Sequence, residues 1–427
     1  DLITLLIVMA AAFTLINVRY LKLPSTIGLM ILALCLSLFV VLGEVVFSTL
    51  NSLAHTIMSE YKFSDVLFKV MLSFLLFAGA LEVDLKKLGE EKWPILILAT
   101  AGTLLSTFIV GTAMYFLLPL IGLNIAYIYC LLFGALISPT DPISVLAMVK
   151  KTKVSKNLEM QISGESLFND GVGVVVFLTI LHVAQAGVEH FQFGSALLLF
   201  VQEVFGGIIL GLVFGFIGFK LLDIIENKYT EIEVLVTLSM VLGGATVAEM
   251  LHISGPLAMV TMGIIVGREG RSEELANVTG EYVYKFWHLI DEAMNAILFI
   301  LIGLQIIVIA WELDFFIAAA IAIGVVLTAR FLGVGIPITG IRIFKKVPKF
   351  TVRVLTWSGL RGGISVALAL SLYDLAEGQV DNYVLDLIIA MTYSVVLFSI
   401  IVQGLTVKKV FKIYDQKNPL PKKSEEE

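Results

Sequence analysis

The sequence Ser138-Pro139-Thr140-Asp141-Pro142 interrupts an apolar stretch that extends from residue 124 to residue 149. Two prolines three residues apart break the backbone hydrogen bonding of a helix. Within so apolar a segment, such a break is tolerated only where protein shields the backbone or where the backbone lines a cavity. The freed carbonyl groups and helix ends can bind ions, so Asp141 is a candidate site residue. The alternative is a plain proline kink.

The whole chain is also rich in apolar residues. Of its 427 residues, 58% are hydrophobic and only 15% are charged, whereas soluble proteins carry about 25% charged residues. This composition excludes an ordinary soluble enzyme, a disordered chain and a nucleic-acid binder. It predicts an all-α polytopic membrane protein. No nucleotide-binding Gly-x-x-x-x-Gly-Lys motif occurs, so the chain does not encode an ATP-driven pump.

The apolar segments predict about thirteen transmembrane helices. We place them at 2–18, 25–43, 63–82, 93–118, 124–149, 158–186, 194–222, 231–250, 254–267, 281–310, 313–340, 351–373 and 383–407. Lysine and arginine gather in the loops after odd-numbered segments and in the tail, and the opposite loops hold only Lys62. By the positive-inside rule, the N-terminus is then outside and the C-terminus is cytoplasmic.

A second polar cluster, Gly164-Glu165-Ser166-Leu167-Phe168-Asn169-Asp170, lies in the sixth segment. Glu165 and Asn169 are four residues apart, as are Ser166 and Asp170, so each pair shares a helix face. The cluster offers oxygen ligands without histidine or cysteine, which suits hard cations. The alternative is a structural hydrogen-bond network.

A third feature is the sequence Trp357-Ser358-Gly359-Leu360-Arg361-Gly362-Gly363, whose glycines weaken a helix in the middle of the twelfth segment. A second broken helix matching the fifth segment indicates inverted repeats with a binding site between them. The buried Arg361 needs an anion, and Glu165 is its candidate partner in a structural ion pair.

Other intramembrane charges are less specific. Arg330 in the eleventh segment fits a buried structural pair as well as a functional role. Glu82 ends the third segment and is a candidate to face an ion path, and Asp291 and Glu292 are candidates to line a cytoplasmic funnel. The stripe Gly207-Gly211-Gly215 predicts close packing of the seventh segment against another helix.

These motifs together resemble the sodium/proton antiporters of the NhaP and NHE type. The resemblance rests on Thr-Asp-Pro at 140–142, Gly-Glu-Ser-Leu-Phe-Asn-Asp at 164–170 and Gly-Leu-Arg-Gly-Gly at 359–363, and it covers almost the whole chain. It implies an inverted-repeat antiporter fold with two crossing broken helices, a homodimer, and a core that moves against a scaffold. It also implies a domain division. The expected parts are a scaffold and dimer domain at 1–92, core at 93–192, linker helix and scaffold at 193–310, core at 311–410, and a cytoplasmic tail at 411–427.

The resemblance also implies site roles. The cation- and proton-binding residues would be Asp170, Asp141, Asn169, Ser166 and Thr140, with Na⁺ bound at Asp170, Asp141, Ser166 and Thr140. Glu82 would be an accessory carboxylate near the ion path, and Glu165 and Arg361 would form the structural ion pair. The Asn-Asp pair implies electroneutral exchange of one Na⁺ or Li⁺ for one proton, because Asp170 holds either ion but not both. The expected protein is a secondary transporter of a prokaryotic plasma membrane. It is not an enzyme, and it needs no cofactor beyond the transported ions.

Three alternatives stay open at this point. K⁺/H⁺ exchange needs only a different site size, which a sequence does not show. A cation channel could use the same carboxylates without coupling to protons. An intramembrane aspartyl protease could pair Asp141 with Asp170, although such proteases use Tyr-Asp and Gly-x-Gly-Asp motifs that these positions lack.

Overall fold

A computed structural model describes residues 2–42, 70–142, 145–146, 149, 155–186, 193–225, 229–267, 278–304, 312–375 and 380–418. These residues form helices and no strand. Eight helices in this part of the chain are long and apolar enough to cross a membrane: Thr4–Leu21, Leu85–Ile121, Lys156–Ala186, Leu197–Ile225, Thr230–Met250, Tyr282–Leu304, Leu313–Ile341 and Asn382–Lys417. Shorter apolar helices span Ser25–Val40, Leu72–Leu81, Tyr127–Ile137, Gly255–Val266 and Gly363–Tyr373.

The prediction of an all-helical membrane protein is confirmed, and each predicted segment overlaps one of these helices. The exact number of spans stays a prediction. Helix α6 (Leu85–Ile97) begins well before the predicted residue 93. The side chain of Asp84 accepts hydrogen bonds from the N–H groups of Lys86 and Lys87 and caps this helix, whose first turns are too polar to register as apolar sequence.

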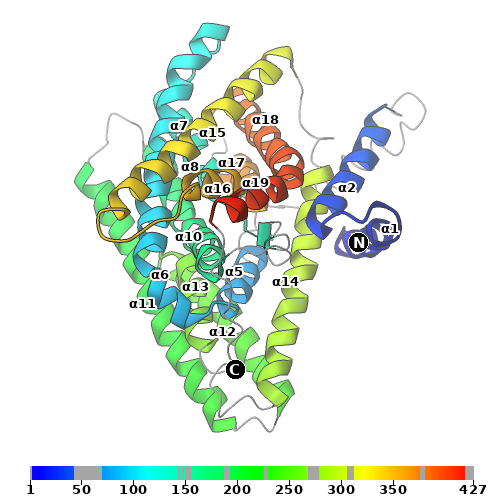
Figure 1. Cartoon of the computed structure of the whole chain (residues 1–427), viewed down its shortest axis with the longest axis vertical. Helices are drawn as coiled ribbons and strands as arrows, with labels where there is room; N and C mark the ends of the chain where they lie inside the picture. The colour runs from blue at the N-terminus through cyan, green and yellow to red at the C-terminus, as the bar shows by residue number, and fades with distance from the viewer. Residues whose placement is uncertain are drawn as a thin grey trace.

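One group of helices contains the N-terminal pair and the two long helices at the edges of Figure 1. Its members are α1 (Leu2–Ile16), α2 (Ser25–Leu42), α5 (Leu72–Leu81), α11 (Phe193–Ile225), α12 (Thr230–Met250), α13 (Gly255–Val266) and α14 (Val278–Leu304). Helix α13 packs between α5 and α11, and α2 packs along α14. Gly211 permits the close approach of α11 to α13, since a Cβ there would lie 2.6 Å from the Ala258 carbonyl oxygen. This confirms the predicted packing of the glycine stripe.

The second group surrounds the broken helices. Its members are α6, the π-helical turn η3 (Leu98–Gly102), α7 (Thr103–Leu117), α8 (Tyr127–Ile137), α10 (Lys156–Ala186), α15 (Leu313–Ile341), α16 (Thr351–Ser358), α17 (Gly363–Leu375), α18 (Asn382–Phe398), the π-helical turn η8 (Ser399–Gln403) and α19 (Gly404–Lys417). Helix α8 packs on α7 and α10, and α15 packs on α7 and α18. Helix α10 also contacts α11 and α13, so it joins the two groups.

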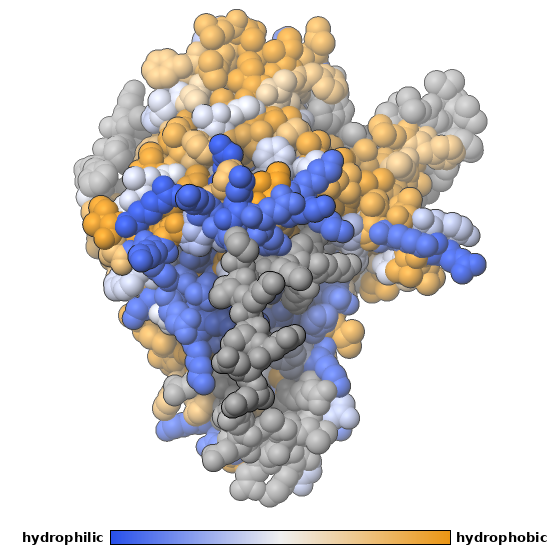
Figure 2. All heavy atoms as spheres, viewed as in Figure 1, coloured by the Kyte–Doolittle hydropathy of each residue, from blue (hydrophilic) through white to orange (hydrophobic). Residues whose placement is uncertain are grey.

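The surface of the molecule is largely apolar. Exposed side chains on the outer helices include Leu198, Phe205, Phe316 and Ile336, each more than half exposed. Figure 2 shows hydrophobic residues over the upper part of the molecule and hydrophilic residues in a belt across its middle. Apolar surface of this extent is suited to contact with lipid rather than water.

Candidate functional site

The two broken helices meet at their breaks. Helix α8 ends at Ile137, just before Pro139, and helix α16 ends at Ser358, just before Gly359. Between them the backbone N–H of Asp141 donates to the carbonyl oxygen of Leu360 at 2.8 Å, in an isolated antiparallel bridge. Backbone groups that lost their helical partners therefore satisfy one another in the interior of the protein. Of residues 143–154, which follow this break, only 145, 146 and 149 are among the described residues.

Arg361 binds the broken helix and not Glu165. Its Nη1 atom donates to the carbonyl oxygens of Ser138 and Pro139, the latter at 2.9 Å, and its backbone N–H donates to the Ser399 hydroxyl at 2.8 Å. The guanidinium therefore neutralises the free carbonyl end of α8, which carries partial negative charge. The predicted Glu165–Arg361 pair is wrong in this respect.

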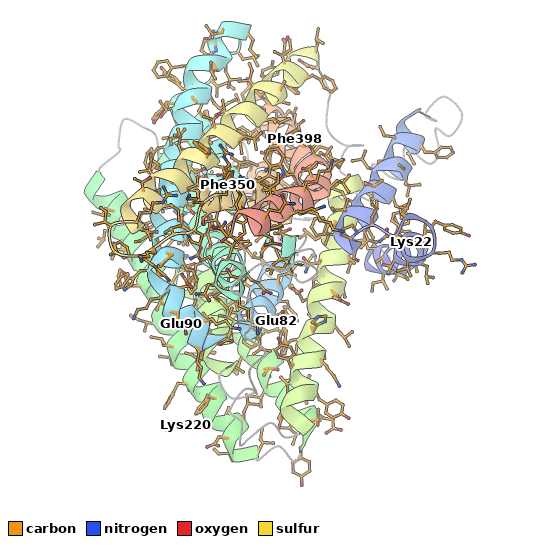
Figure 3. All side chains as sticks on the ribbon, viewed as in Figure 1. Lys22, Glu82, Glu90, Lys220, Phe350 and Phe398 are labelled. Carbon is orange, nitrogen blue, oxygen red and sulfur yellow. The ribbon has the colours of Figure 1, made fainter. Side chains whose placement is uncertain are left out.

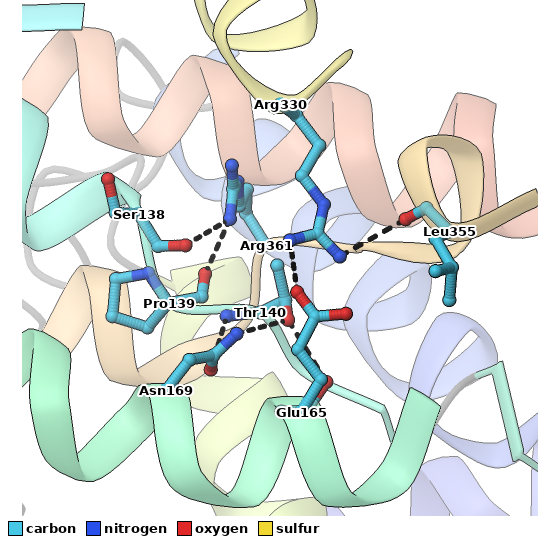
Figure 4. A network of polar contacts seen from close by, with 9 residues as sticks. Ser138, Pro139, Thr140, Glu165, Asn169, Arg330, Leu355 and Arg361 are labelled. Atoms are coloured by element: carbon cyan, nitrogen blue, oxygen red, sulfur yellow. Dashed lines mark hydrogen bonds and ion pairs between the residues drawn. The ribbon is translucent and has the colours of Figure 1, made fainter. Parts of the chain in front are cut away.

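Glu165 forms its ion pair with Arg330 of α15 (Figure 4). The carboxylate is 1% exposed, and the Arg330 side chain is 9% exposed. Arg330 also donates through Nη2 to the Leu355 carbonyl oxygen of α16 at 3.1 Å. One buried guanidinium thus connects three helices, α10, α15 and α16. Of the two uses left open for Arg330, the structure shows the buried ion pair.

Thr140 is held by the polar cluster of α10. Its backbone N–H donates to the Asn169 Oδ1 atom at 3.2 Å, and its hydroxyl accepts from the Asn169 amide at 2.8 Å. The same hydroxyl lies 3.0 Å from the Ser166 hydroxyl, at hydrogen-bonding distance. All three residues are buried. These bonds fix the extended backbone beside Asp141.

A cavity of about 690 Å³ lies beside the crossing, and Asp141, Asp170 and Thr140 line it. Asp170 is 6% exposed. Glu82, Asp291 and other polar residues extend the lining away from the crossing. The further polar members are Asp84, Lys87, Lys156, Glu159, Ser163, Tyr284, His288, Glu292, Asn295 and Ser365. Ser166 and Asn169 do not line the cavity, because they lie behind Thr140.

The site is also sterically constrained. A Cβ on Gly362 would lie 2.5 Å from the Oδ2 atom of Asp141, so no larger residue fits there without movement. This glycine lets the second broken helix pass directly against the Asp141 side chain. The residue pattern therefore supplies two carboxylates, a hydroxyl and free carbonyl groups around one cavity, which can bind a small cation or a proton.

Comparison with known proteins identifies the family to which this chain belongs. The profile of the family described as "Sodium/hydrogen exchanger, transmembrane" matches residues 5–413. The chain belongs to the sodium/hydrogen exchanger family. The predicted resemblance is thereby confirmed.

Two curated relatives of this exchanger are similar over nearly their full length. It is 45% identical to the Na⁺/H⁺ antiporter NhaP of Pseudomonas aeruginosa over 428 positions, which cover 99% of this chain and 98% of that protein. It is 32% identical to the Na⁺/H⁺ antiporter NhaH of Halobacillus aidingensis over 96% of this chain and 97% of that protein. The structure of the sodium proton antiporter MjNhaP1 from Methanocaldococcus jannaschii superposes with a TM-score of 0.75 at 20% identity, covering 96% of this exchanger and 97% of that chain. This superposition shows the same fold.

Two contributions to the exchanger site escaped the sequence analysis. Ser399 accepts the Arg361 N–H and donates to Gln403 Oε1 at 2.6 Å, and Gln403 donates to the Trp357 carbonyl oxygen at 3.4 Å. Both residues belong to the π-helical turn η8 between α18 and α19. A serine and a glutamine four residues apart in an apolar segment were the available signal, and they were not singled out.

Proposed function

We propose that this chain exchanges Na⁺ or Li⁺ for H⁺ at one shared site. The observation that carries the proposal is that Asp141 and Asp170 line the same cavity at the crossing of two broken helices. Carboxylate, hydroxyl and carbonyl oxygens are the ligands that hard cations prefer. The names of the curated relatives, Na⁺/H⁺ antiporters NhaP and NhaH, support this assignment and favour Na⁺ over K⁺.

Asp170, Asp141, Thr140 and Ser166 are the proposed Na⁺ ligands. Asp170 and Asp141 supply carboxylate oxygens, and Thr140 supplies the backbone carbonyl freed at the break. Ser166, whose hydroxyl lies 3.0 Å from that of Thr140, would have to turn its side chain toward the cavity to bind the ion. Asn169 holds Thr140 in place, and Glu82 guides cations along the cavity wall.

The coupling of Na⁺ transport to proton transport follows from the competition of the two ions for one site. A proton on Asp170 removes the charge that binds Na⁺, and bound Na⁺ disfavours the proton, so the site holds one or the other. A core domain with an ion bound at its site moves across the membrane more readily than one with an empty, anionic site, because an uncompensated charge resists burial. Exchange then proceeds without ATP, as expected of a secondary transporter.

The grouping of the helices supports movement of a core against a scaffold. Helices α7, α8, α10 and α15–α19 would form the moving core, and the group containing α5 and α11–α14 would form the scaffold. Helix α6 packs on α10, so the proposed boundary at residue 92 divides a helix whose contacts lie with the core. We keep 1–92 and 193–310 as scaffold and 93–192 and 311–410 as core, with a homodimer formed through the scaffold.

The lining of the cavity supports a proposal for the conformational state and the membrane orientation. The cavity wall includes Asp84, Lys87 and Lys156, which lie at the starts of α6 and α10, at helix ends that the charge distribution assigns to the cytoplasm. We therefore propose that the chain faces inward in this structure, with the N-terminus outside and the C-terminus in the cytoplasm of a prokaryotic plasma membrane.

Reconstitution in liposomes with a trapped pH dye tests the function. Imposed Na⁺ or Li⁺ gradients should drive proton movement that does not respond to membrane voltage. Asp170→Asn should abolish it, whereas the matched variant Asp223→Asn, at an exposed aspartate at the end of α11, should retain it. The readout is the initial rate of intravesicular pH change for each variant at equal protein density.

The same assay separates the alternatives. A response to K⁺ but not to Na⁺ would assign K⁺/H⁺ exchange. Cation flux without proton movement would assign a channel. Cleavage of a membrane peptide with no ion flux would assign an aspartyl protease. Any of these outcomes, or full exchange by folded Asp170→Asn, contradicts the proposal.

A further inference from the structure

A groove separate from the ion cavity runs along the outer surface of α15 and α16. It has a volume of about 700 Å³. Apolar side chains form its walls, and three cations lie along it. The lining residues are Phe331, Leu332, Gly335, Ile336, Thr339, Arg342, Lys349, Phe350, Val352 and Arg353. No residue is shared with the cavity, and Figure 3 labels Phe350 of the groove well apart from Glu82 of the cavity.

The cations of this groove, Arg342, Lys349 and Arg353, are not paired with carboxylates in the described part of the chain. All three are exposed. Nearby Lys345, by contrast, pairs with the buried Glu91 at 2.6 Å. Three uncompensated cations beside an apolar groove are complementary to an anion with an attached hydrocarbon chain.

The local backbone holds one of these cations in position. Phe350 adopts a left-handed conformation with a φ of 66°, which is unusual for a bulky residue. Its ring lies 4.8 Å from the Arg353 guanidinium carbon in a cation–π contact. The contact holds the exposed guanidinium beside Phe350, where it lines the groove.

A second apolar pocket continues from the first. It has a volume of about 330 Å³, shares Phe331, Phe350 and Arg353 with the groove, and extends to Tyr414 of α19. Thr356 lines it, is 8% exposed, and its hydroxyl has no hydrogen-bond partner. Two apolar channels that meet at one arginine, with an unused buried hydroxyl beside them, match a molecule with two hydrocarbon chains, polar ester groups and an anionic head.

We propose that this groove binds an anionic glycerophospholipid of the cytoplasmic leaflet. The phosphate lies among Arg342, Lys349 and Arg353, the acyl chains occupy the two apolar channels, and Thr356 donates to an ester carbonyl. The basic residues belong to the loop that the charge distribution assigns to the cytoplasm, where anionic headgroups attract such clusters.

Native mass spectrometry of the purified protein with dioleoyl phosphatidylglycerol tests the proposal. Wild type should bind phosphatidylglycerol and discriminate against dioleoyl phosphatidylcholine. Each cation contributes roughly a factor of five, so Arg342→Gln/Lys349→Gln/Arg353→Gln should bind about a hundredfold more weakly. The matched triple Lys408→Gln/Lys409→Gln/Lys412→Gln loses the same charge outside the groove and should bind as wild type does.

A variant that keeps every charge tests the apolar walls of the groove. A Cβ on Gly335 meets only Val352 Cγ1, at 3.7 Å, so Gly335→Leu can be accommodated while its side chain fills the groove. It should also lose phosphatidylglycerol binding. Retention of Na⁺-driven proton movement by each variant shows that it is folded, and a variant that fails this check is replaced by the single substitution Arg342→Gln.

Several outcomes would overturn the proposal. These are unchanged binding by the groove triple or by Gly335→Leu, and equal binding of phosphatidylcholine by wild type. Displacement of phosphatidylglycerol by millimolar inorganic phosphate would indicate a simple anion site. A gain in lipid binding on Glu425→Gln/Glu426→Gln/Glu427→Gln would make the acidic tail the occupant instead.

Discussion

Replacement of Arg330 by Met tests which arginine compensates Glu165. The substitution removes the partner of a carboxylate that is 1% exposed and leaves the Leu355 carbonyl without its donor. Removal of one member of a buried ion pair destabilises a protein by about 3–5 kcal/mol, because the remaining charge stays buried without compensation. We therefore expect Arg330→Met to lower the free energy of unfolding by about that amount.

The double variant Glu165→Leu/Arg330→Met should recover most of this loss. Apolar residues of similar volume replace a buried pair at little net change in stability. A double-mutant cycle should thus give a coupling energy of at least about 2 kcal/mol between Glu165 and Arg330. The same cycle with Arg361→Met should give less than about 1 kcal/mol, since Arg361 bonds to the Ser138 and Pro139 carbonyls instead.

Unfolding in mixed micelles by titration with sodium dodecyl sulfate, followed by tryptophan fluorescence, supplies these free energies. Each variant must be expressed at an equal level and must unfold in a single transition, so that the free energies of the double-mutant cycle can be compared. A coupling of Glu165 to Arg361 that equals or exceeds its coupling to Arg330 would refute the assignment of the ion pair.

Three further predictions follow from the site and its support. Because one proton competes with one cation, the apparent KM for Na⁺ should rise by about tenfold per pH unit on the acidic side, and a KM independent of pH would contradict a shared site. Gly362→Ala should abolish transport through its collision with the neighbouring aspartate, whereas Gly340→Ala, with no atom within 4 Å of the new Cβ, should transport normally. Glu91→Leu should destabilise the protein by about 2 kcal/mol in the micelle titration. This loss is smaller than the loss expected on breaking a fully buried ion pair, because the Lys345 side chain is 35% exposed. The control Glu90→Leu should change stability by less than about 0.5 kcal/mol.

Features with a local cause were predictable from the sequence. The prolines around Asp141 and the glycines around Arg361 change the backbone at their own positions, so both helix breaks were placed correctly. The long runs of apolar residues likewise located the helices. The start of α6 was missed because its first turns are polar and depend on the cap from Asp84.

The choice between the two arginines was not predictable. Arg330 and Arg361 each lie in the middle of an apolar segment, and the sequence alone allows either of them to neutralise Glu165. The outcome depends on the tertiary placement of the two side chains. Arg330 reaches Glu165 from α15, while Arg361 donates to the carbonyl oxygens at the end of α8. Helix crossing is a property of the tertiary structure, and a single sequence does not display it.

The arrangement of these charges bears on stoichiometry. Glu165 and Arg330 cancel each other on the side of α10 away from the cavity. At the crossing itself, Asp141 and Asp170 contribute two negative charges, and Arg361, held by carbonyl dipoles, contributes one positive charge that is not used by Glu165. One further positive charge makes this set neutral, and either one Na⁺ or one proton supplies it. Because neutral groups cross a low-dielectric interior most readily, we expect exchange of one cation for one proton rather than a ratio that moves net charge.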